Sequence, residues 1–284
     1  MDRFALPPRS LPLPSLLILL FSGFYALFGW LFWGMGMIFF WIFFMNSEII
    51  HLPAFAEWEP GQAIIQQVEE TNAQENEADI YRYIYRYVVD ADTFTGRSYV
   101  TGWLRAAGEK VEIEYQKDRP SISRIRGGRT EMFGSLVALV VIFPLVGLGF
   151  ILFSLWKNGK AIRLLIQGEF ARGRLLSSTP TKMTINDQPV YQYTFEFEAK
   201  DGSRQQVVCN THRGSALEDE ESELIIYLPS RPAYAVVYDG IPNAPAIQPD
   251  GSFAPFPARK LWVLLIPLLA LLLHITWYVL VYAA

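Results

Sequence analysis

Three long apolar runs that contain no charged side chain constrain this chain more than any other feature of its sequence. They cover 29 residues at positions 16–44, 25 residues at positions 132–156 and 22 residues at positions 261–282. A helix needs about 20 predominantly apolar residues to cross the hydrocarbon core of a bilayer. A buried helix of a soluble protein usually keeps a polar stripe, whereas these runs are apolar on every side. We therefore predict three transmembrane helices with these bounds.

The first run is a retained anchor rather than a cleaved signal peptide. Its apolar part is much longer than the roughly 7–15 residues of a signal sequence, and no small-residue cleavage site follows it. Only 18% of all residues are charged, against about 25% in an average soluble chain. The three runs account for this deficit, because every charged residue lies outside them.

Basic residues at the ends of the runs predict the orientation. Arg3 and Arg9 precede the first run, and Arg259 and Lys260 precede the third, which no charge follows. The positive-inside rule then places residues 1–15 in the cytoplasm as an N-terminal tail. It places 45–131 outside and 157–239 inside, although the basic residues on either side of the second run are nearly balanced.

The two polar segments between the runs share a sequence pattern, which predicts a duplicated β-domain. Four alternating aromatic residues recur at an offset of 110: Tyr81, Tyr83, Tyr85 and Tyr87, then Tyr191, Tyr193, Phe195 and Phe197. Tyr115-x3-Arg119-Pro120 then matches Tyr227-x3-Arg231-Pro232 with the offset shifted by two. Period-2 alternation with aromatic and β-branched residues is typical of strands with one buried face.

We expect five strands in each segment and a small closed or half-closed barrel of the SH3 or OB type, which removes exposed sheet edges. The expected strands are 63–68, 81–90, 97–103, 110–116 and 121–125, then 170–177, 190–199, 204–210, 223–228 and 233–238. Residues 92–96 should form a longer turn in the first segment. Asp201-Gly202 should form a tight hairpin turn in the second, because Asp-Gly supplies the positive φ that such turns need. The fold class is therefore α+β, with three transmembrane helices and two β-barrel-like domains.

Residues 168–239 also resemble a known family. In order they carry a glycine start, Y-x-Y-x-F-x-F, D-G-S-R, V-V-C and L-I-I-Y-L-P-S-R-P-A-Y-A-V-V. This order resembles the bacterial domain of unknown function 3592 family. The resemblance implies a small β-domain flanked by membrane helices in the bacterial inner membrane, and it assigns no catalytic residue. The first segment departs from the pattern by an acidic insert at 69–79 and by Gln116-Lys117-Asp118 in place of Leu228-Pro229-Ser230.

Candidate catalytic or metal-binding residues are few. Cys209 and His212 have the C-x-x-H spacing of half a zinc site, but the remaining histidines, His51 and His274, form no second pair, and a closed structural site requires four ligands. The common offset places Cys209 opposite Tyr99, so we expect a buried apolar cysteine. No Ser-His-Asp arrangement is recognisable. We therefore predict no catalytic, cofactor-binding or metal site.

Other polar features favour structural interpretations. His274 lies inside the third run, where an ionisable residue is by default a functional hypothesis, but Ser135, Tyr25 or a backbone carbonyl would satisfy a neutral imidazole. The acidic residues at 69–79 and at 218–221, followed by Glu223, should be solvated loops. The five prolines within 240–260 predict an extended linker. Four arginines near the second run could bind anionic headgroups: Arg119, Arg124, Arg126 and Arg129.

Small residues in the runs would let helix backbones approach closely, and this allows a homo-oligomer. They are Ser22, Ala26, Gly29, Gly34 and Gly36 in the first run, and Gly134, Gly147 and Gly149 at the second.

We expect a non-enzymatic, multi-pass protein of the bacterial inner membrane that presents its β-domains to an envelope protein partner, with membrane lipids around its helices. The alternative is a component of a transport or export assembly, and a membrane-bound hydrolase is a weaker third. The net charge of −4 gives no reason to expect a nucleic-acid partner, and the single cysteine excludes an intrachain disulfide.

Overall fold

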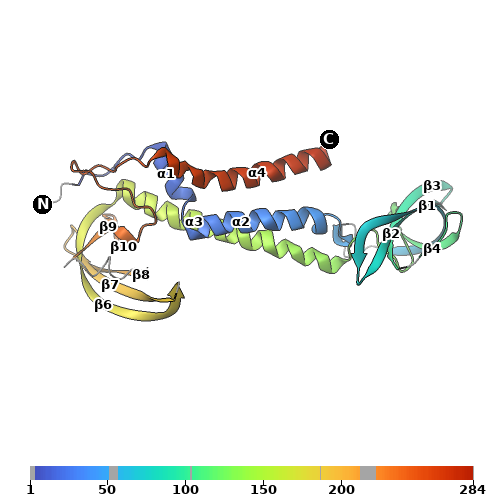
Figure 1. Ribbon diagram of the computed structural model, residues 1–284, viewed down its shortest axis with the longest axis horizontal. Helices are drawn as coiled ribbons and strands as arrows, with labels where there is room; N and C mark the ends of the chain where they lie inside the picture. Colours follow the sequence, from blue (N-terminus) through green and yellow to red (C-terminus); the bar gives the residue numbers. More distant parts are fainter. Residues whose placement is uncertain (1–3, 51–56, 103, 186, 212–221, 284) are drawn as a thin grey trace. The chain divides into compact units, whose positions relative to one another are not determined.

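The computed structural model describes residues 4–50, 57–102, 104–185, 187–211 and 222–283 (Figure 1). It contains two five-stranded antiparallel sheets and three long apolar helices, so the protein is α+β. The chain divides into two compact units. The terminal unit comprises Met1–Phe32 and Val146–Ala284, and the central unit comprises Trp33–Leu145. Each sheet lies within one unit.

Three helices are long and apolar enough to cross a membrane: Phe24–Phe44, Ser135–Gln167 and Ala258–Ala283. The first consists of α2 (Phe24–Phe39) and a π-helical turn, Phe40–Phe44. The second consists of a 3-10 segment, Ser135–Val141, and α3 (Ile142–Gln167). The third consists of a 3-10 segment, Ala258–Leu264, then α4 (Leu265–Tyr278) and a π-helical end, Val279–Ala283. A shorter helix, α1 (Leu13–Phe21), precedes them.

The expected single helix at 16–44 is therefore wrong in its first part, because the chain breaks between α1 and α2. Gly23 has a φ of +94°, a backbone conformation that favours glycine. The carbonyls at the end of α1 lose their helical partners there, and Asn158 of α3 replaces them. Its amide donates to the carbonyl oxygens of Leu20, at 2.9 Å, and Ser22, at 3.1 Å. A buried polar side chain inside an apolar helix thus stabilises the break.

Two of the small residues expected at helix contacts do bring backbones together. A Cβ at Gly29 would lie 2.8 Å from the backbone nitrogen of Ile151, and one at Gly36 would lie 2.6 Å from that of Pro144. Both distances are too short for a side chain, so glycine is required where α2 passes α3. At Gly149 no described atom outside the neighbouring backbone of α3 lies within 4 Å of an added Cβ, so this glycine makes no close helix contact within the described residues.

The first sheet has the strand order β3-β2-β1-β4-β5. Its strands are β1 (Trp58–Glu75), β2 (Ala78–Val89), β3 (Asp92–Thr101), β4 (Lys110–Gln116) and β5 (Arg119–Ile125). The alternating tyrosines of β2 form its core with isoleucines of the neighbouring strands. Backbone hydrogen bonds of 2.9 Å between Tyr99 of β3 and Arg129, beyond β5, join the two edges and nearly close a barrel.

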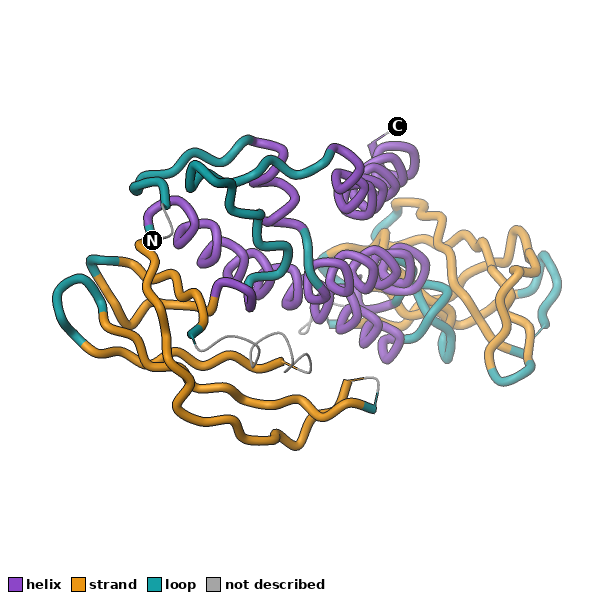
Figure 2. The backbone as a smooth tube through the Cα atoms, turned by 60° about the vertical axis from the view of Figure 1, so that its left-hand side comes forward, coloured by secondary structure: helices purple, strands orange, loops and turns teal. Residues whose placement is uncertain are grey.

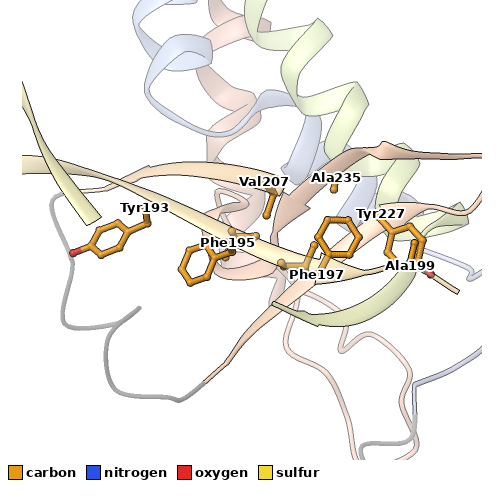
Figure 3. Close-up of a cluster of buried hydrophobic side chains, with 9 residues drawn as sticks. Tyr193, Phe195, Phe197, Ala199, Val207, Tyr227 and Ala235 are labelled. Carbon is orange, nitrogen blue, oxygen red and sulfur yellow. The ribbon is translucent and has the colours of Figure 1, made fainter. Parts of the chain in front are cut away.

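The second sheet has the order β8-β7-β6-β9-β10 (Figure 2). Its strands are β6 (Glu169–Ile185), β7 (Gln188–Glu198), β8 (Arg204–Thr211), β9 (Glu223–Leu228) and β10 (Arg231–Val237). Tyr193, Phe195 and Phe197 project from β7 into the core (Figure 3). All ten strands lie where the alternation predicted them, and most are longer than predicted.

The two sheets correspond residue for residue. β1 is bulged at Ile65/Gln67 and again at Glu70/Gln74 against β2, and β6 is bulged at Leu175/Ser177 and Pro180/Thr184 against β7. Corresponding positions in these hairpins therefore differ by 110 residues. Polar contacts follow the same correspondence. The hydroxyls of Thr71 and Thr181 each donate to the carbonyl nine residues ahead, at 2.7 Å.

A second pair of polar contacts recurs between the first and fourth strands of each sheet. The Tyr115 hydroxyl donates to Glu59 at 3.0 Å, and the Tyr227 hydroxyl donates to Glu169 at 3.4 Å. In the fourth and fifth strands the difference becomes 112, because Ile113 pairs with Ile125 where Ile225 pairs with Val237.

Several expected loops are not loops. Residues 69–79 form the end of the β1–β2 hairpin, which turns at Asn76-Glu77, and β6–β7 has an equally long hairpin. The expected turn at 92–96 is part of β3, because Asp90 and Ala91 supply the positive φ values of a two-residue turn. At Asp201-Gly202 the loop is longer than the two residues expected, since Ala199 donates its N–H to the Ser203 carbonyl. α3 continues to Gln167, so the second domain begins at 169 rather than 157.

Candidate functional site

The two sheets differ most on their outer faces, which are turned away from the aromatic cores. On the second sheet this face is apolar and covered. Phe170 of β6, Ile226 and Leu228 of β9 and Tyr238 after β10 pack with the end of α3 and with the segment after the sheet. The buried partners from those two segments are Leu164, Leu165, Ile241 and Phe253. The expected extended linker at 240–260 is therefore wrong in part, because it packs on the sheet.

The N-terminal tail completes this cover. The Arg9 guanidinium donates to the carbonyl oxygens of Leu165, at 3.2 Å, and Gly168, at 2.7 Å, and lies 4.7 Å from the centre of the Phe170 ring. A cation at a helix C-terminus stabilises the unpaired carbonyls and the negative end of the helix dipole. Ala5 also donates its N–H to the Gly251 carbonyl at 3.0 Å. The tail, the end of α3 and the linker thus lie together on one side of the second sheet.

The first sheet carries polar residues at the same positions. Gln62, Glu112, Glu114, Arg124 and Arg126 correspond to Arg172, Leu224, Ile226, Val236 and Tyr238. Glu112 and Arg126 are exposed, whereas their counterparts Leu224 and Tyr238 are half-buried and buried, respectively. A groove of about 500 Å³ runs over β1 and β4 here, lined by Trp58, Pro60, Gly61, Gln62, Glu112 and Arg126, among others. We take this groove, with its charged rim, as the candidate functional site and call it the β1–β4 groove.

Trp58 forms one end of the groove and is held in place by Arg124. The guanidinium carbon lies 4.5 Å from the centre of the indole ring. The same guanidinium contacts Glu114 at 2.9 Å and Glu48 at 3.2 Å. Glu48 follows the first apolar helix, so this ion pair connects the groove with the end of that helix. Because Arg124 is held by two carboxylates while it lies over the indole ring, the cation–π contact fixes the orientation of Trp58 at the groove.

The other charges of the groove are solvent-exposed. Arg126 contacts Glu112 at 2.8 Å, and both side chains are about two-thirds exposed. The neighbouring carboxylate raises the pKa of Arg126. An exposed pair of this kind contributes little to stability, so both groups can exchange their mutual contact for charges on a partner.

A second cavity, of about 230 Å³, lies where the first sheet closes, and its lining includes Arg97, Ser123, Thr130 and Glu131. Arg97 contacts the buried carboxylate of Glu131 at 2.7 Å. Among the described residues, the buried hydroxyl of Thr130 has no hydrogen-bond partner. At the corresponding sequence positions the second domain has Val208 and Ala235 in its sheet, and Pro242 and Asn243 in the segment after β10.

The cysteine lies in a packing position. Cys209 pairs with Tyr193 and therefore corresponds to Ser98, which pairs with Tyr83, and not to Tyr99 as the common offset predicted. A Cβ on Gly128 would lie 2.8 Å from the Ser98 hydroxyl, and one on Gly240 would lie 3.0 Å from the Cys209 sulfur. Burial raises the pKa of the thiol, which makes it less reactive. His51, His212 and the acidic residues 218–221 lie outside the described residues.

The remaining sequence candidates also have structural positions. His274 is buried on α4. Three of the four arginines expected to meet lipid headgroups contact carboxylates of their own domain: Arg124 and Arg126 as described, and Arg129, which contacts Glu75 at 2.6 Å. Within the described residues, no group of three His, Cys, Asp or Glu side chains could hold a metal ion.

The groove was missed because each strand was interpreted alone. The sequence signal lies in the two fourth strands, K-V-E-I-E-Y-Q and E-L-I-I-Y-L. In the first, outward positions alternate as glutamates, and in the second nearly every position is apolar. Their alignment would have predicted one solvated and one covered face.

The fold and the site together define a class of protein with three long apolar helices and two β-domains. One β-domain packs against the end of α3 and the linker, and the other has an exposed groove on its outer face. No protein-family model matches the sequence, and a search of curated proteins finds no match either.

Proposed function

We propose that this protein is a non-enzymatic, three-span protein of the bacterial inner membrane that binds a protein partner of the envelope through the β1–β4 groove. One observation carries the proposal. Two corresponding sheet faces have opposite chemistry: one is apolar and covered by its own chain, and the other is charged, grooved and exposed at its rim.

The residues of the groove fit a protein partner. Tryptophan and arginine are the residue types that most often dominate binding energy at protein interfaces, especially where a ring of polar contacts excludes water around them. Trp58 and Arg124 supply such a pair, and Glu112 with Arg126 supplies exposed charges of both signs at the rim. Opposite charges on a partner would set the register of binding.

Contacts in the terminal unit support the orientation that the basic residues predict. The N-terminal tail packs on the second sheet and on the end of α3, so these three segments belong on the same side. With Phe24–Phe44 as one span, the tail and the second β-domain would be cytoplasmic and the first β-domain would face outward. Lipids would surround the exposed apolar side chains of the helices, and association of two copies through them is compatible with this arrangement.

The matched bulges and polar contacts support a common origin. Two bulges, a threonine contact and a tyrosine–glutamate pair recur at corresponding positions. We infer that one β-domain of the SH3 or OB type was duplicated together with a membrane helix. The resemblance of residues 168–239 to the domain of unknown function 3592 family agrees with this inference.

Site-specific photocrosslinking in cells tests the partner. A photoreactive amino acid at Gln62, inside the groove, should give a crosslinked product of defined mass, and an Arg126→Glu substitution should abolish it. The matched control is the same photoreactive residue at Arg86, an exposed position on β2. Equal products from both positions, or none from Gln62 in any growth condition, would refute a partner at the groove.

A further inference from the structure

Matched stretches of the first strands of the two long hairpins have opposite charge, although they correspond residue for residue. Residues 60–76 of the β1–β2 hairpin contain Glu69, Glu70 and Glu75 and no basic residue. Residues 170–186 of the β6–β7 hairpin contain Arg172, Arg174 and Lys182 and no acidic residue. These two matched stretches therefore carry three negative charges in one domain and three positive charges in the other, and the basic stretch lies between two acidic residues, Glu169 and Asp187.

The end of the β6–β7 hairpin also exposes large apolar side chains. Leu176 is 41% exposed, Met183 60% and Ile185 41%. At the corresponding positions, the acidic hairpin has Gln66, Ala73 and Glu75. A strand end that combines exposed apolar side chains with lysine and arginine is suited to a membrane surface, where the apolar groups enter the interface and the cations meet anionic headgroups.

The position of the hairpin in the terminal unit agrees with such a contact. β6 begins at Glu169, directly after α3 ends at Gln167, and Gly168 between them donates its N–H to the Leu164 carbonyl. The base of the hairpin is thus fixed at the end of a helix that is long and apolar enough to span a bilayer. Figures 1 and 2 show the hairpin extending well beyond the rest of its sheet.

We propose that the end of the β6–β7 hairpin inserts Leu176, Met183 and Ile185 into the headgroup region of an anionic leaflet, with Arg174 and Lys182 against lipid phosphates. This inference rests on the proposed membrane insertion of the helices. The cytoplasmic side, where that orientation places the hairpin, is the side that basic residues favour. The acidic β1–β2 hairpin makes no such contact.

Quenching by lipid spin labels tests this contact in the full-length protein, reconstituted in vesicles of phosphatidylcholine with phosphatidylglycerol. Cys209→Ser removes the only cysteine and places there the residue found at the corresponding Ser98. Single cysteines are then introduced as Met183→Cys, as its exact counterpart Ala73→Cys, and as Leu272→Cys on α4, and each is labelled with an environment-sensitive fluorophore. Nitroxide lipids should quench the label at 183 at least about twice as strongly as the label at 73. Adding Arg174→Glu and Lys182→Glu, or omitting phosphatidylglycerol, should reduce the quenching at 183.

The label at 272 separates the two proposals. If it is quenched while the label at 183 is not, the helices are in the bilayer and the hairpin contact is refuted. If quenching at 183 is strong but insensitive to both charge reversal and phosphatidylglycerol, the anionic-surface proposal is refuted. If 272 itself escapes quenching, the three-span proposal fails, and the hairpin contact fails with it.

Discussion

The two β-domains share a scaffold but not a surface, and the difference separates what makes the fold from what makes the site. Inward positions hold tyrosine, phenylalanine and isoleucine in both sheets, and the bulges coincide. Outward positions decide whether the face is covered by α3 and the linker or left as the β1–β4 groove. Because successive strand residues point to opposite faces, one face could change without disturbing the other.

Truncation of corresponding aromatic side chains in the two cores should cause the largest loss of stability. Tyr85→Ala and Phe195→Ala each remove a fully buried ring and should each cost about 3–5 kcal/mol. Since the two cores are separate clusters, each substitution should increase amide hydrogen exchange only in its own sheet. Exchange that rises in both sheets from one substitution would show that the domains unfold as one cooperative unit.

Ser98 and Cys209 occupy corresponding positions in the two sheets, and their replacement by alanine should reduce the stability of the two domains by different amounts. The Ser98 hydroxyl donates to the Arg129 carbonyl at 2.9 Å and accepts from the Ile125 N–H at 3.1 Å. Ser98→Ala leaves both backbone groups unsatisfied and should cost about 1–3 kcal/mol, whereas Cys209→Ala should cost about 1 kcal/mol. Denaturant titrations followed by hydrogen exchange in each sheet would measure both. A larger cost at Cys209 would contradict its assignment as a packing residue.

Two contacting core residues of the first domain can be replaced by the residues that occupy the corresponding positions in the second domain. The hydroxyls of Tyr85 and Ser123 lie 2.9 Å apart in the core, and Phe195 and Ala235 stand at the corresponding positions. Ser123→Ala alone removes the hydrogen bond between Ser123 and the buried Tyr85 hydroxyl, and should reduce the free energy of unfolding by about 1–2 kcal/mol. Adding Tyr85→Phe should recover most of that loss, because neither partner then remains unpaired. Purely additive losses in this double-mutant cycle would show that the contact carries no coupling energy.

The smallest effect concerns pH. The hydrogen bond from Arg129 holds the pKa of Glu75 below its usual value, so the pair stabilises the first domain above about pH 4.3 and is lost as the pH falls through the lowered pKa. The contribution is under about 1 kcal/mol because Glu75 is half exposed. Glu75→Gln should flatten the acid limb of the first sheet's stability profile and leave the second sheet, with Ile185 at that position, unchanged. An unchanged acid limb in the variant would mean that other carboxylates account for it.

Periodicity in the sequence was sufficient for the helices and strands, because length and alternation are local properties. The presence of three long apolar helices and the positions of all ten strands follow from them, whereas the helix bounds do not, since the helices cover Phe24–Phe44, Ser135–Gln167 and Ala258–Ala283. The correspondence of Cys209 with Ser98 could not be predicted, since one additional residue in the β7–β8 loop changes the offset, and only strand pairing shows it.

Other features depend on partners distant in the chain. The break after α1 is set by Gly23 together with Asn158, more than 130 residues later. The cover on the second sheet combines residues from the tail, α3 and the linker. No local pattern marks either arrangement, and the groove became recognisable only when the two outer faces were compared.

The contact of Asn158 with the end of α1 also imposes an order on synthesis. The carbonyls of Leu20 and Ser22 receive their donor only after α3 has been translated as far as residue 158. By then the whole first β-domain has been synthesised, since all of its strands precede α3 in the sequence. α1 can therefore complete its hydrogen bonds only after the sequence of the first β-domain and the second apolar run have been synthesised.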